Sequence, residues 1–244
     1  MKKPVLIFLL FLSQFCYSQN NIELVESIPI ETTLDNPDIR NTQEVWLEMI
    51  NSAQKTLDIE QFYISNEKGE PLDTILHAII AAAKRGVIVR IIVDGEMFRT
   101  YPVDVTWLEQ QSPNITKHVI DFKSLAGGIQ HAKFFIVDGK EVFLGSQNFD
   151  WRALKHFHEL GVKFSGDNDL IRIYSDIFNE DWKYSEINDG KTWNLPIYTI
   201  SGPDFMIYKS TYGDSIHVKP TISSKEFYHI NGDKDLDEIL FMIN

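Results

Sequence analysis

Cysteine is nearly absent from this sequence of 244 residues. The single residue, Cys16, falls within the first 19 residues of the chain. A chain with one cysteine cannot form an internal disulfide, so its fold must be held together by its core. Thiol chemistry is likewise excluded from any site that lies outside those first residues.

Positive charge is also scarce in this chain. Lys and Arg together number 23 against 35 Asp and Glu, which gives a formal net charge of −12 at pH 7. Such a chain repels phosphate polymers and anionic membranes at long range, so a substrate of either kind must be held by local contacts. This balance argues against tight, sequence-reading binding to DNA.

The first 19 residues combine a basic start, an apolar centre and a small-residue end. Lys2 and Lys3 precede the apolar run, and Cys16–Ser18 follows it. This order is typical of a secretory signal peptide, so residues 1–19 are predicted to be removed and the protein exported, either secreted or periplasmic. A transmembrane anchor is disfavoured because the apolar run is too short to span a bilayer. Lipid attachment at Cys16 is a second alternative, which the bulky preceding residue disfavours.

Helical and strand-like periodicities alternate along the rest of the chain. This alternation predicts the α/β class, with a mixed β-sheet flanked by helices on both faces. Thr42 is the predicted N-cap of the first helix. The predicted helices are residues 41–53, 72–85 and 104–110, one near Asp150, and 170–184, and the predicted strands are 55–64, 87–93, 115–120, 131–137, 141–144 and 159–164.

Residues 187–230 lack such periodicity. Scattered aromatics, Pro196 and the pair Gly202–Pro203 predict irregular loops there, with at most a pair of short strands. The chain is therefore divided into a signal peptide (1–19), a main domain (25–186), an irregular segment (187–230) and a final stretch (231–244).

The interpretation of function rests on residues 127–159. The strand-like part begins at His131, and because alternate side chains of a strand share a face, His131 and Lys133 are expected to point the same way. The pair Asp138–Gly139 is a strong turn signal and predicts a hairpin, whose second strand returns over residues 141–144.

Small polar residues follow that second strand, close to the expected mouth of the hairpin. Ser146 and Asn148 would there join His131 and Lys133 at one edge of the sheet. An imidazole, an ammonium, a hydroxyl and a carboxamide can each donate hydrogen bonds or positive charge to oxygen. The set is suited to an anionic phosphoryl group.

These residues form the pattern H-x-K-x4-D-x6-G-S-x-N. Its six specified positions are His131, Lys133, Asp138, Gly145, Ser146 and Asn148. The pattern resembles the signature of the phospholipase D superfamily, often called the HKD motif, and the likeness extends to Trp151–Arg152 and Glu159–Val162. The sequence of this region is similar to that of the secreted and lysosomal branch of the superfamily, which includes phospholipases and single-strand exonucleases. The resemblance implies one half of a phospholipase D-like fold and phosphodiester hydrolysis with no metal or other cofactor.

The resemblance also implies a role for each site residue. His131 would attack phosphorus and form a phosphohistidine, which water or another alcohol then resolves. Lys133 would neutralise a non-bridging oxygen, and Ser146 and Asn148 would donate hydrogen bonds to the same group. Glu159 stands at the position from which the family fixes the tautomer of the histidine.

Asp138 admits two interpretations. As a member of the signature, it is a candidate catalytic residue. As the first residue of an Asp-Gly turn, it is more simply explained as a turn former that bonds to its own backbone.

The signature occurs once, whereas the resemblance implies a second copy whose histidine protonates the leaving group. Trp46–Asn51 (WLEMIN) and Ile239–Asn244 (ILFMIN) share four residues at identical spacing, as expected if the chain stops where a second half begins. A two-fold symmetric dimer would bring His131 of two copies to one site. The predicted partners are therefore a phosphodiester substrate and a second copy or half.

Two other functions remain open. A non-catalytic half-domain that only dimerises or binds anionic ligands would explain the single signature. A metal-dependent phosphatase would use His156 and His158 with carboxylates, although these two histidines are more simply surface or interface residues. The carboxylates at the predicted strand ends match no recognised metal spacing, and they are Asp58, Glu60, Asp94 and Glu96.

Two substrate classes also remain open. A phospholipid would need an exposed apolar rim beside the site, which the aromatic residues between Phe134 and Phe157 could supply. The end of a single-stranded nucleic acid would need basic and stacking groups along a groove. The signature fits either class.

Overall fold

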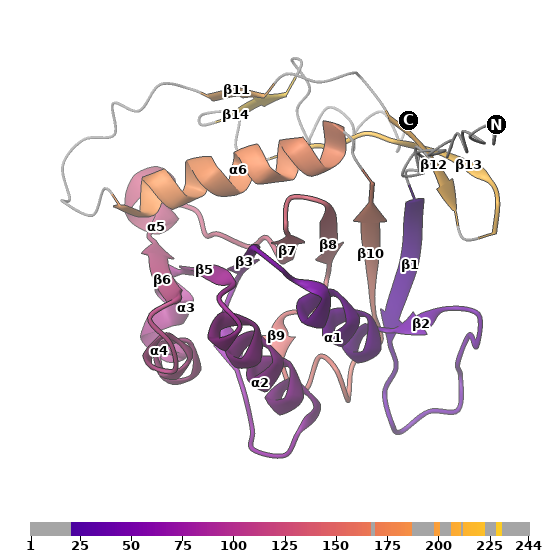
Figure 1. Cartoon of the computed structure of the whole chain (residues 1–244), viewed down its shortest axis with the longest axis horizontal. Coiled ribbons are helices and arrows are strands. Elements are labelled where there is room, and N and C mark those ends of the chain that lie inside the picture. Colours follow the sequence, from indigo (N-terminus) through magenta and orange to yellow (C-terminus); the bar gives the residue numbers. More distant parts are fainter. Residues whose placement is uncertain are drawn as a thin grey trace, which may run out of the picture.

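The computed structural model of the chain describes residues 21–166, 169–186, 198–200, 206–210, 212–222 and 228–230. The predicted signal peptide and the predicted beginning of a second half, residues 231–244, lie outside the described residues. One mixed sheet runs through the described part, with helices against both of its faces (Figure 1). The predicted α/β class is confirmed.

The main sheet has an antiparallel centre and a parallel edge. In the order in which they lie across it, its strands are β13 (Ser215–Val218), β12 (Met206–Ser210), β1 (Asn21–Ser27), β10 (Glu159–Ser165), β8 (Glu141–Gly145), β7 (Phe134–Val137), β3 (Thr56–Gln61), β5 (Ile88–Asp94) and β6 (Ile115–Ile120), with β2 (Arg40–Asn41) paired to β1. The hairpin of β7 and β8 is antiparallel to both of its neighbours, β3 and β10. Beyond β3, the strands β5 and β6 continue the sheet in parallel.

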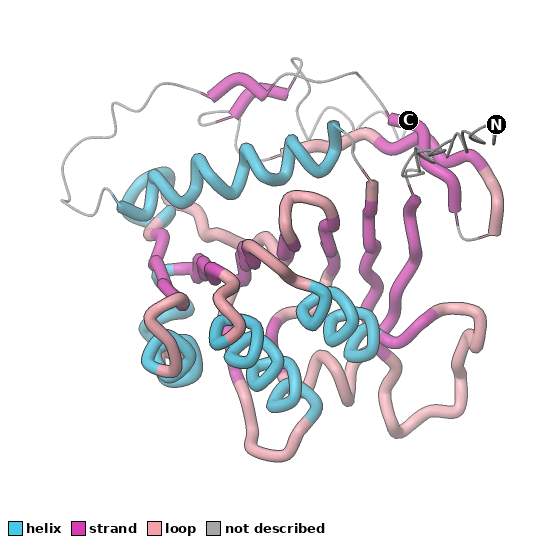
Figure 2. Tube along the Cα trace, viewed as in Figure 1, coloured by secondary structure: helices cyan, strands magenta, loops and turns pink. Residues whose placement is uncertain are grey.

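Helices occupy the connections between strands. They are α1 (Thr42–Ser52), α2 (Pro71–Lys84), α3 (Gly95–Thr100), α4 (Val103–Gln110), α5 (Phe122–Ala126) and α6 (Asp169–Glu186). Figure 2 shows α6 crossing one face of the sheet, with α1 and α2 packed side by side on the other. Two small parallel sheets join β4 (Ile64–Ser65) to β9 (Phe149–Asp150) and β11 (Tyr198–Ile200) to β14 (Tyr228–Ile230).

Strand β7 divides the hydrophobic core into two parts. Because successive side chains of a strand point to opposite faces, Phe134 and Ile136 pack in the core beneath α6, whereas Phe135 and Val137 pack in the core beneath α1 and α2. Trp46 of α1 is fully buried, and its ring meets the Phe135 ring edge-on at 6.1 Å. Both faces of β7 are therefore buried in a hydrophobic core, which explains its uninterrupted run of apolar residues.

The start of α1 differs from the prediction. Asn41, not Thr42, caps the helix, because the Asn41 side chain accepts a hydrogen bond from the backbone N–H of Gln43 at 2.9 Å. The Thr42 hydroxyl is buried instead and accepts a hydrogen bond from Gln147 Nε2 at 3.0 Å. The prediction of Thr42 as the cap is wrong by one residue.

The helix predicted near Asp150 is absent from the described residues. Phe149 and Asp150 form β9, which pairs with β4, and turns follow over residues 151–156. The Asp150 side chain accepts a hydrogen bond from the backbone N–H of Arg152 at 2.8 Å. Such a local bond competes with helix formation, and strand pairing adds to it, so tertiary structure overrides the local pattern.

The chain after α6 is more regular than predicted. β12 and β13 form an antiparallel hairpin, and β12 pairs in parallel with β1 at the edge of the main sheet. Within the described ranges, no helix has both the length and the apolar character that crossing a membrane requires.

Candidate active site

The first and last residues of the β7–β8 hairpin meet at its open end. The strand was predicted to begin at His131, but β7 begins at Phe134, so His131 and Lys133 lie in the connection before it. The backbone N–H of Gly145 nevertheless donates to the carbonyl of Lys133 at 3.1 Å. This bond places Lys133 directly beside the end of β8.

Gln130 holds the connection that leads to His131. Its backbone N–H donates to Asp94 Oδ2 at 2.8 Å, and its side-chain Nε2 donates to Glu60 Oε1 at 2.9 Å. Asp94 and Glu60 lie in the parallel strands β5 and β3, near their carboxyl ends. The parallel edge of the sheet thus positions the segment that carries the histidine.

His131 is exposed, and its ring meets the Phe62 ring edge-on at 4.6 Å. Partial burial and the nearby charge of Lys133 lower the pKa of the imidazole, and the carboxylate of Asp94 opposes this shift. A neutral imidazole has a free lone pair, so His131 is suited to nucleophilic attack near neutral pH.

Lys133 is almost completely buried, with 5% of its surface exposed. Its Nζ donates a hydrogen bond to the carbonyl oxygen of His131 at 2.8 Å and lies 5.3 Å from the centre of the Phe62 ring. Burial lowers the pKa of Lys133 to about 8, against the opposing attraction of Glu159. An ammonium in such a site stabilises negative charge more strongly than one in water.

Glu159, the first residue of β10, faces Lys133. Burial and the charge of Asp150 raise the pKa of Glu159 to about 7, although Lys133 and a hydrogen bond with Ser146 pull it down. Its buried Oε2 has no hydrogen-bond partner among the described residues. The expected contact of Glu159 with the ring of His131 is not seen in this part of the chain, where Asp94 is the carboxylate that acts on His131.

Ser146 and Asn148 lie at the open end of the hairpin, as predicted. The Ser146 hydroxyl accepts a hydrogen bond from the backbone N–H of Leu160 at 3.3 Å. Asn148 Oδ1 is buried and has no partner within the described ranges. Gln147, between them, points inward and is fully buried. Ser146, in contrast, is exposed, and Asn148 is partly exposed.

Gly145 of the signature has a steric role. A Cβ on Gly145 would lie 2.1 Å from Gln147 Oε1, and one on the paired Gly161 would lie 2.4 Å from the Phe143 ring. Side chains at either glycine would force Gln147 or Phe143 out of the core. The two glycines therefore let the core close directly beneath Ser146.

Asp138 lies at the closed end of the same hairpin, away from the site residues. Its Oδ1 accepts hydrogen bonds from the backbone N–H groups of Lys55 at 2.7 Å and Thr56 at 2.9 Å, and its Oδ2 accepts one from Gln54 at 2.9 Å. These bonds lower the pKa of Asp138 against the effect of burial. Asp138 lies in the turn with a φ of 53°, but its side chain bonds to residues 54–56 and not, as the turn-forming interpretation expected, to its own backbone. None of these bonds joins it to His131.

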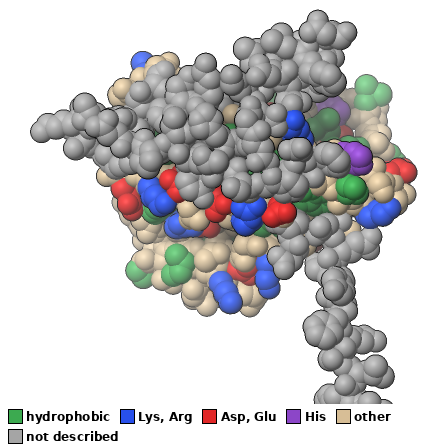
Figure 3. Space-filling model, turned by 90° about the horizontal axis from the view of Figure 1, so that it is seen from above, with side chains coloured by type: hydrophobic (Ala, Val, Ile, Leu, Met, Phe, Trp, Pro, Cys, Tyr) green, Lys and Arg blue, Asp and Glu red, His purple; other side chains and the backbone are tan. Residues whose placement is uncertain are grey.

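A mostly apolar pocket of about 680 Å³ lies on the α6 side of the segment that carries His131. Glu60 and Asp181 line it together, and burial and the second carboxyl raise the pKa of Glu60 well above its usual value. Its apolar walls include Phe122, Phe134, Phe164, Leu170, Tyr174 and Ile177. In Figure 3, acidic and basic side chains are interspersed on the coloured part of the surface seen from above.

The two neighbouring histidines each contact a glutamate. His156 Nδ1 lies 2.5 Å from Glu31 Oε1, and His158 Nε2 lies 2.8 Å from Glu26 Oε2. Within the described ranges, no group of three or more His, Cys, Asp or Glu residues is arranged to hold a metal ion. The expectation that these histidines are surface residues agrees with their positions.

Phe62 and Asp94 were not singled out as neighbours of His131 from the sequence. Each belongs to the carboxyl end of a parallel strand, Phe62 directly after β3 and Asp94 as the last residue of β5. The carboxyl ends of adjacent parallel strands form one edge, where sites commonly lie. That placement was the signal in the sequence that could have found them.

Comparison with known proteins gives a consistent result. The family model described as "Cardiolipin synthase, PLD-like domain" matches residues 46–182. The virion nicking-joining enzyme of Vaccinia virus (strain Western Reserve) is 34% identical over 176 residues, which cover 71% of this chain and 39% of that protein. The 5′-3′ exonuclease PLD3 of Bos taurus is 32% identical over 200 residues, which cover 75% of this chain and 40% of that protein. The chain thus spans about two fifths of the length of these curated relatives.

The fold has a counterpart among solved structures. Nuc from Salmonella typhimurium, described as a phospholipase D family member, superposes with a TM-score of 0.54 at 22% identity. The match covers 68% of this chain and 96% of Nuc, so the arrangement of the sheet and its helices is shared. Together, the signature at the open end of the hairpin, the family model and the shared fold show that this chain belongs to the PLD-like domain family of the phospholipase D superfamily.

Proposed function

We propose that this protein is a phosphodiesterase that breaks a P–O bond through a covalent phosphohistidine at His131. The observation that carries the proposal is an accessible imidazole with a lowered pKa beside the buried ammonium of Lys133. The neutral ring can attack phosphorus, and the ammonium can offset the charge on the phosphoryl oxygens. The relatives named as a nicking-joining enzyme and an exonuclease support the same class of reaction.

The reaction would proceed in two steps. A ring nitrogen of His131 attacks phosphorus, the bond to the leaving oxygen breaks with its electron pair, and an acid protonates that oxygen. Water then attacks phosphorus, the P–N bond breaks, and the proton of the water passes to the group that served as the acid. The products are an alcohol and a phosphomonoester, and His131 is restored.

The acid of this reaction is proposed to come from outside the described part of the chain. Within that part, the charges that act on His131 belong to Lys133 and Asp94, and neither is a second imidazole. A second copy of the chain, or a second half of a longer one, would supply a histidine in two-fold symmetry.

The substrate is proposed to be a phosphodiester in a phospholipid or a nucleic acid, and the protein is proposed to act after export without a metal ion. A second candidate function is a non-catalytic half-domain that dimerises or binds anionic ligands. The observation that favours it is the single copy of the signature in this sequence.

Hydrolysis of bis-p-nitrophenyl phosphate tests the proposal. The rate is measured for the wild type and for His131→Ala, with and without chelator, on fractions whose mass in solution is known. His77→Ala is the matched control, because His77 is exposed and its ring contacts Asp73 and Trp107, neither of which is a site residue. We expect chelator-resistant turnover in a dimeric fraction, lost in His131→Ala and kept in His77→Ala.

Two results would count against the proposal. Turnover that survives His131→Ala would contradict the nucleophile. No turnover from any well-folded fraction, at any mass, would favour the non-catalytic half-domain.

A further inference from the structure

One buried amide holds the segment that carries His131. This segment forms neither helix nor strand, so no ladder of backbone hydrogen bonds fixes its path. Gln130, which is 3% exposed, donates from Nε2 to Glu60 Oε1 at 2.9 Å and to the carbonyl oxygen of Ala132 at 3.3 Å. The residue before His131 and the residue after it are therefore both fastened to Glu60 of β3 through a single side chain.

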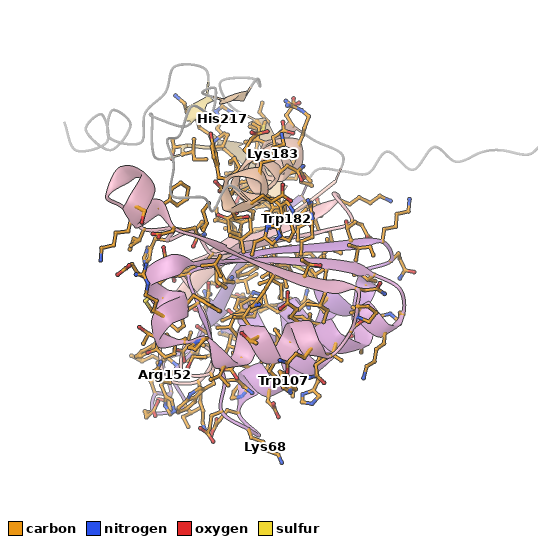
Figure 4. All side chains as sticks on the ribbon, turned by 90° about the vertical axis from the view of Figure 1, so that its left-hand side faces the viewer. Lys68, Trp107, Arg152, Trp182, Lys183 and His217 are labelled. Atoms are coloured by element: carbon orange, nitrogen blue, oxygen red, sulfur yellow. The ribbon has the colours of Figure 1, made fainter. Side chains whose placement is uncertain are left out.

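Asp181 of α6 places a second buried carboxyl against Glu60. The two side chains are hydrogen-bonded, and Glu60 is 1% and Asp181 4% exposed. The contact lies on the face of the sheet that α6 covers, since Figure 4 shows Trp182, the next residue of α6, across the sheet from Trp107 and Arg152. Two ionised carboxylates have no donor between them, so a hydrogen bond between these groups requires a proton on one of them.

Among the described residues, no cation bonds Glu60 Oε2 in place of that proton. Arg90 of β5 lies on the same face, against α6, but its guanidinium is bonded to Asp58 at 2.7 Å and 2.8 Å. Asp94 adds a further carboxylate at the end of β5. The titratable groups that the neighbouring elements and the adjoining segment bring to this region are Asp58, Arg90, Asp94, His118, Asp181, Tyr184, His131 and Lys133.

We propose that Gln130 is a positioning residue for His131, and that it holds the imidazole in place only while Glu60 and Asp181 share a proton. This inference rests on the proposed function, since it concerns the orientation of the proposed nucleophile. Both carboxyls line the pocket that His131 also lines, which gives the proton a path to solvent.

The direction of the pH effect follows from the charge on the pair. With one proton the pair carries a single negative charge, and Glu60 stays against both Gln130 and Asp181. When that proton leaves, two like charges in a site with little water repel each other, and Glu60 can no longer remain at both partners. Burial and the carboxyl of Asp181 raise the pKa of Glu60, so the shared proton persists above the pH at which an ordinary carboxyl ionises. Activity should fall as the pH rises through the ionisation of the pair.

The NMR signal of the His131 ring tests the inference without requiring catalysis. The Cε1–H resonance is identified by its absence from His131→Ala, and its chemical shift is followed from acid to alkaline pH. We expect an inflection in the wild type that Glu60→Gln and, independently, Asp181→Asn remove. Each variant replaces one carboxyl with an amide that can donate the same hydrogen bond and does not titrate. The inflections caused by the ring itself and by Lys133 should persist in both.

Hydrolysis of bis-p-nitrophenyl phosphate tests the positioning. Gln130→Met keeps the length of the side chain and removes its donors, so kcat should fall about 10- to 100-fold, with KM nearly unchanged because Gln130 holds the nucleophile and not the substrate. Gln111→Met is the matched control, since the amide of Gln111 also bonds a backbone carbonyl, that of Trp107, away from the site. Glu60→Gln preserves the acceptor for Gln130, so it should keep kcat and lose less of it than the wild type in alkali.

The two measurements separate this inference from the proposed function. Absence of turnover from the folded wild type would contradict the proposed function, while the His131 resonance would still decide the role of the pair. The same inflections in the wild type, Glu60→Gln and Asp181→Asn would overturn the shared proton. Wild-type kcat per folded molecule in Gln130→Met, with an unchanged His131 resonance, would show that Gln130 only packs and would overturn its positioning role.

Discussion

The two ends of the β7–β8 hairpin carry residues of the same signature in opposite chemical states. At the closed end, Asp138 accepts three backbone hydrogen bonds, and its pKa is lowered. At the open end, the pKa of Lys133 falls to about 8 and that of Glu159 rises to about 7, so both shifts disfavour the charged form. Asn148 Oδ1 and Glu159 Oε2 are buried there without partners among the described residues.

This difference separates a structural member of the signature from the candidate catalytic ones. A polar group whose bonds are satisfied within the chain contributes to stability, as Asp138 does. Buried groups with shifted pKa values and open bonding positions cost stability, and such groups are concentrated at functional sites. The site is therefore placed at the open end, and substitutions at the two ends should affect different measurements.

The largest effect is expected at the open end, from Lys133→Met. The substitution keeps much of the side-chain volume and removes the charge that would stabilise the phosphoryl oxygens, so kcat should fall about 10²- to 10³-fold. Lys140→Met is the control at the closed end, where Lys140 is exposed. Equal rates of bis-p-nitrophenyl phosphate hydrolysis for the two variants would contradict the placement of the active site at the open end of the hairpin.

An intermediate effect is expected at the closed end, from Asp138→Asn. Asparagine tolerates the positive φ of 53° but lacks the charge that the three backbone N–H groups bond, so the free energy of unfolding should fall by about 2 kcal/mol. Activity per folded molecule should persist. Urea unfolding and steady-state rates are the measurements, with Asp35→Asn at an exposed position as the control.

The sign of the pH dependence follows from the lowered pKa of Asp138. Its stabilisation is fully present above the unfolded pKa, about 3.9, and is lost as the pH falls through the lower folded value. The difference in stability between the wild type and Asp138→Asn should therefore shrink in acid. A difference that stays constant down to the lowest pH at which the protein folds would contradict this account.

The smallest effect is expected from Glu159→Gln. The folded pKa, about 7, lies above the unfolded value of about 4.3, so the folded wild type binds the extra proton and loses stability as the pH rises between these values. The variant should lack this slope and exceed the wild type by on the order of 1 kcal/mol at pH 8, after solvent screening. If the free energies of unfolding of the wild type and the variant run parallel from pH 4 to 8, the raised pKa of Glu159 is contradicted.

Helices and strands whose apolar residues recur with a clear period were predicted well from the sequence. The strand predicted at residues 115–120 is β6, and the helix predicted at 72–85 is α2, with its bounds shifted by one residue. α2 buries a continuous apolar face, and β6 buries the isoleucine at each of its ends. The five-residue α5 and the six-residue α3 were missed, because such short helices span too few turns to show a period.

The sequence predicted which residues form the candidate site better than it predicted the contacts that they make. Lys133, Ser146, Asn148 and Glu159 do gather at the open end, because motif spacing and hairpin geometry together determine their positions. The neighbours of His131 depend on how β3 and β5 pair across the sheet, which no local pattern reveals. The tertiary contacts of Asp138 with residues 54–56 escaped prediction for the same reason.

The most direct test of the central claim is to trap the covalent intermediate at His131. The protein is mixed with a phosphodiester substrate, the reaction is quenched in the millisecond-to-second range, and the masses of its peptides are measured at alkaline pH, where phosphohistidine survives. The account predicts a phosphoryl adduct on the peptide that contains His131, formed and consumed at the rate of turnover and absent from His131→Ala. Turnover with no adduct on that peptide, or with the adduct on another residue, would contradict it.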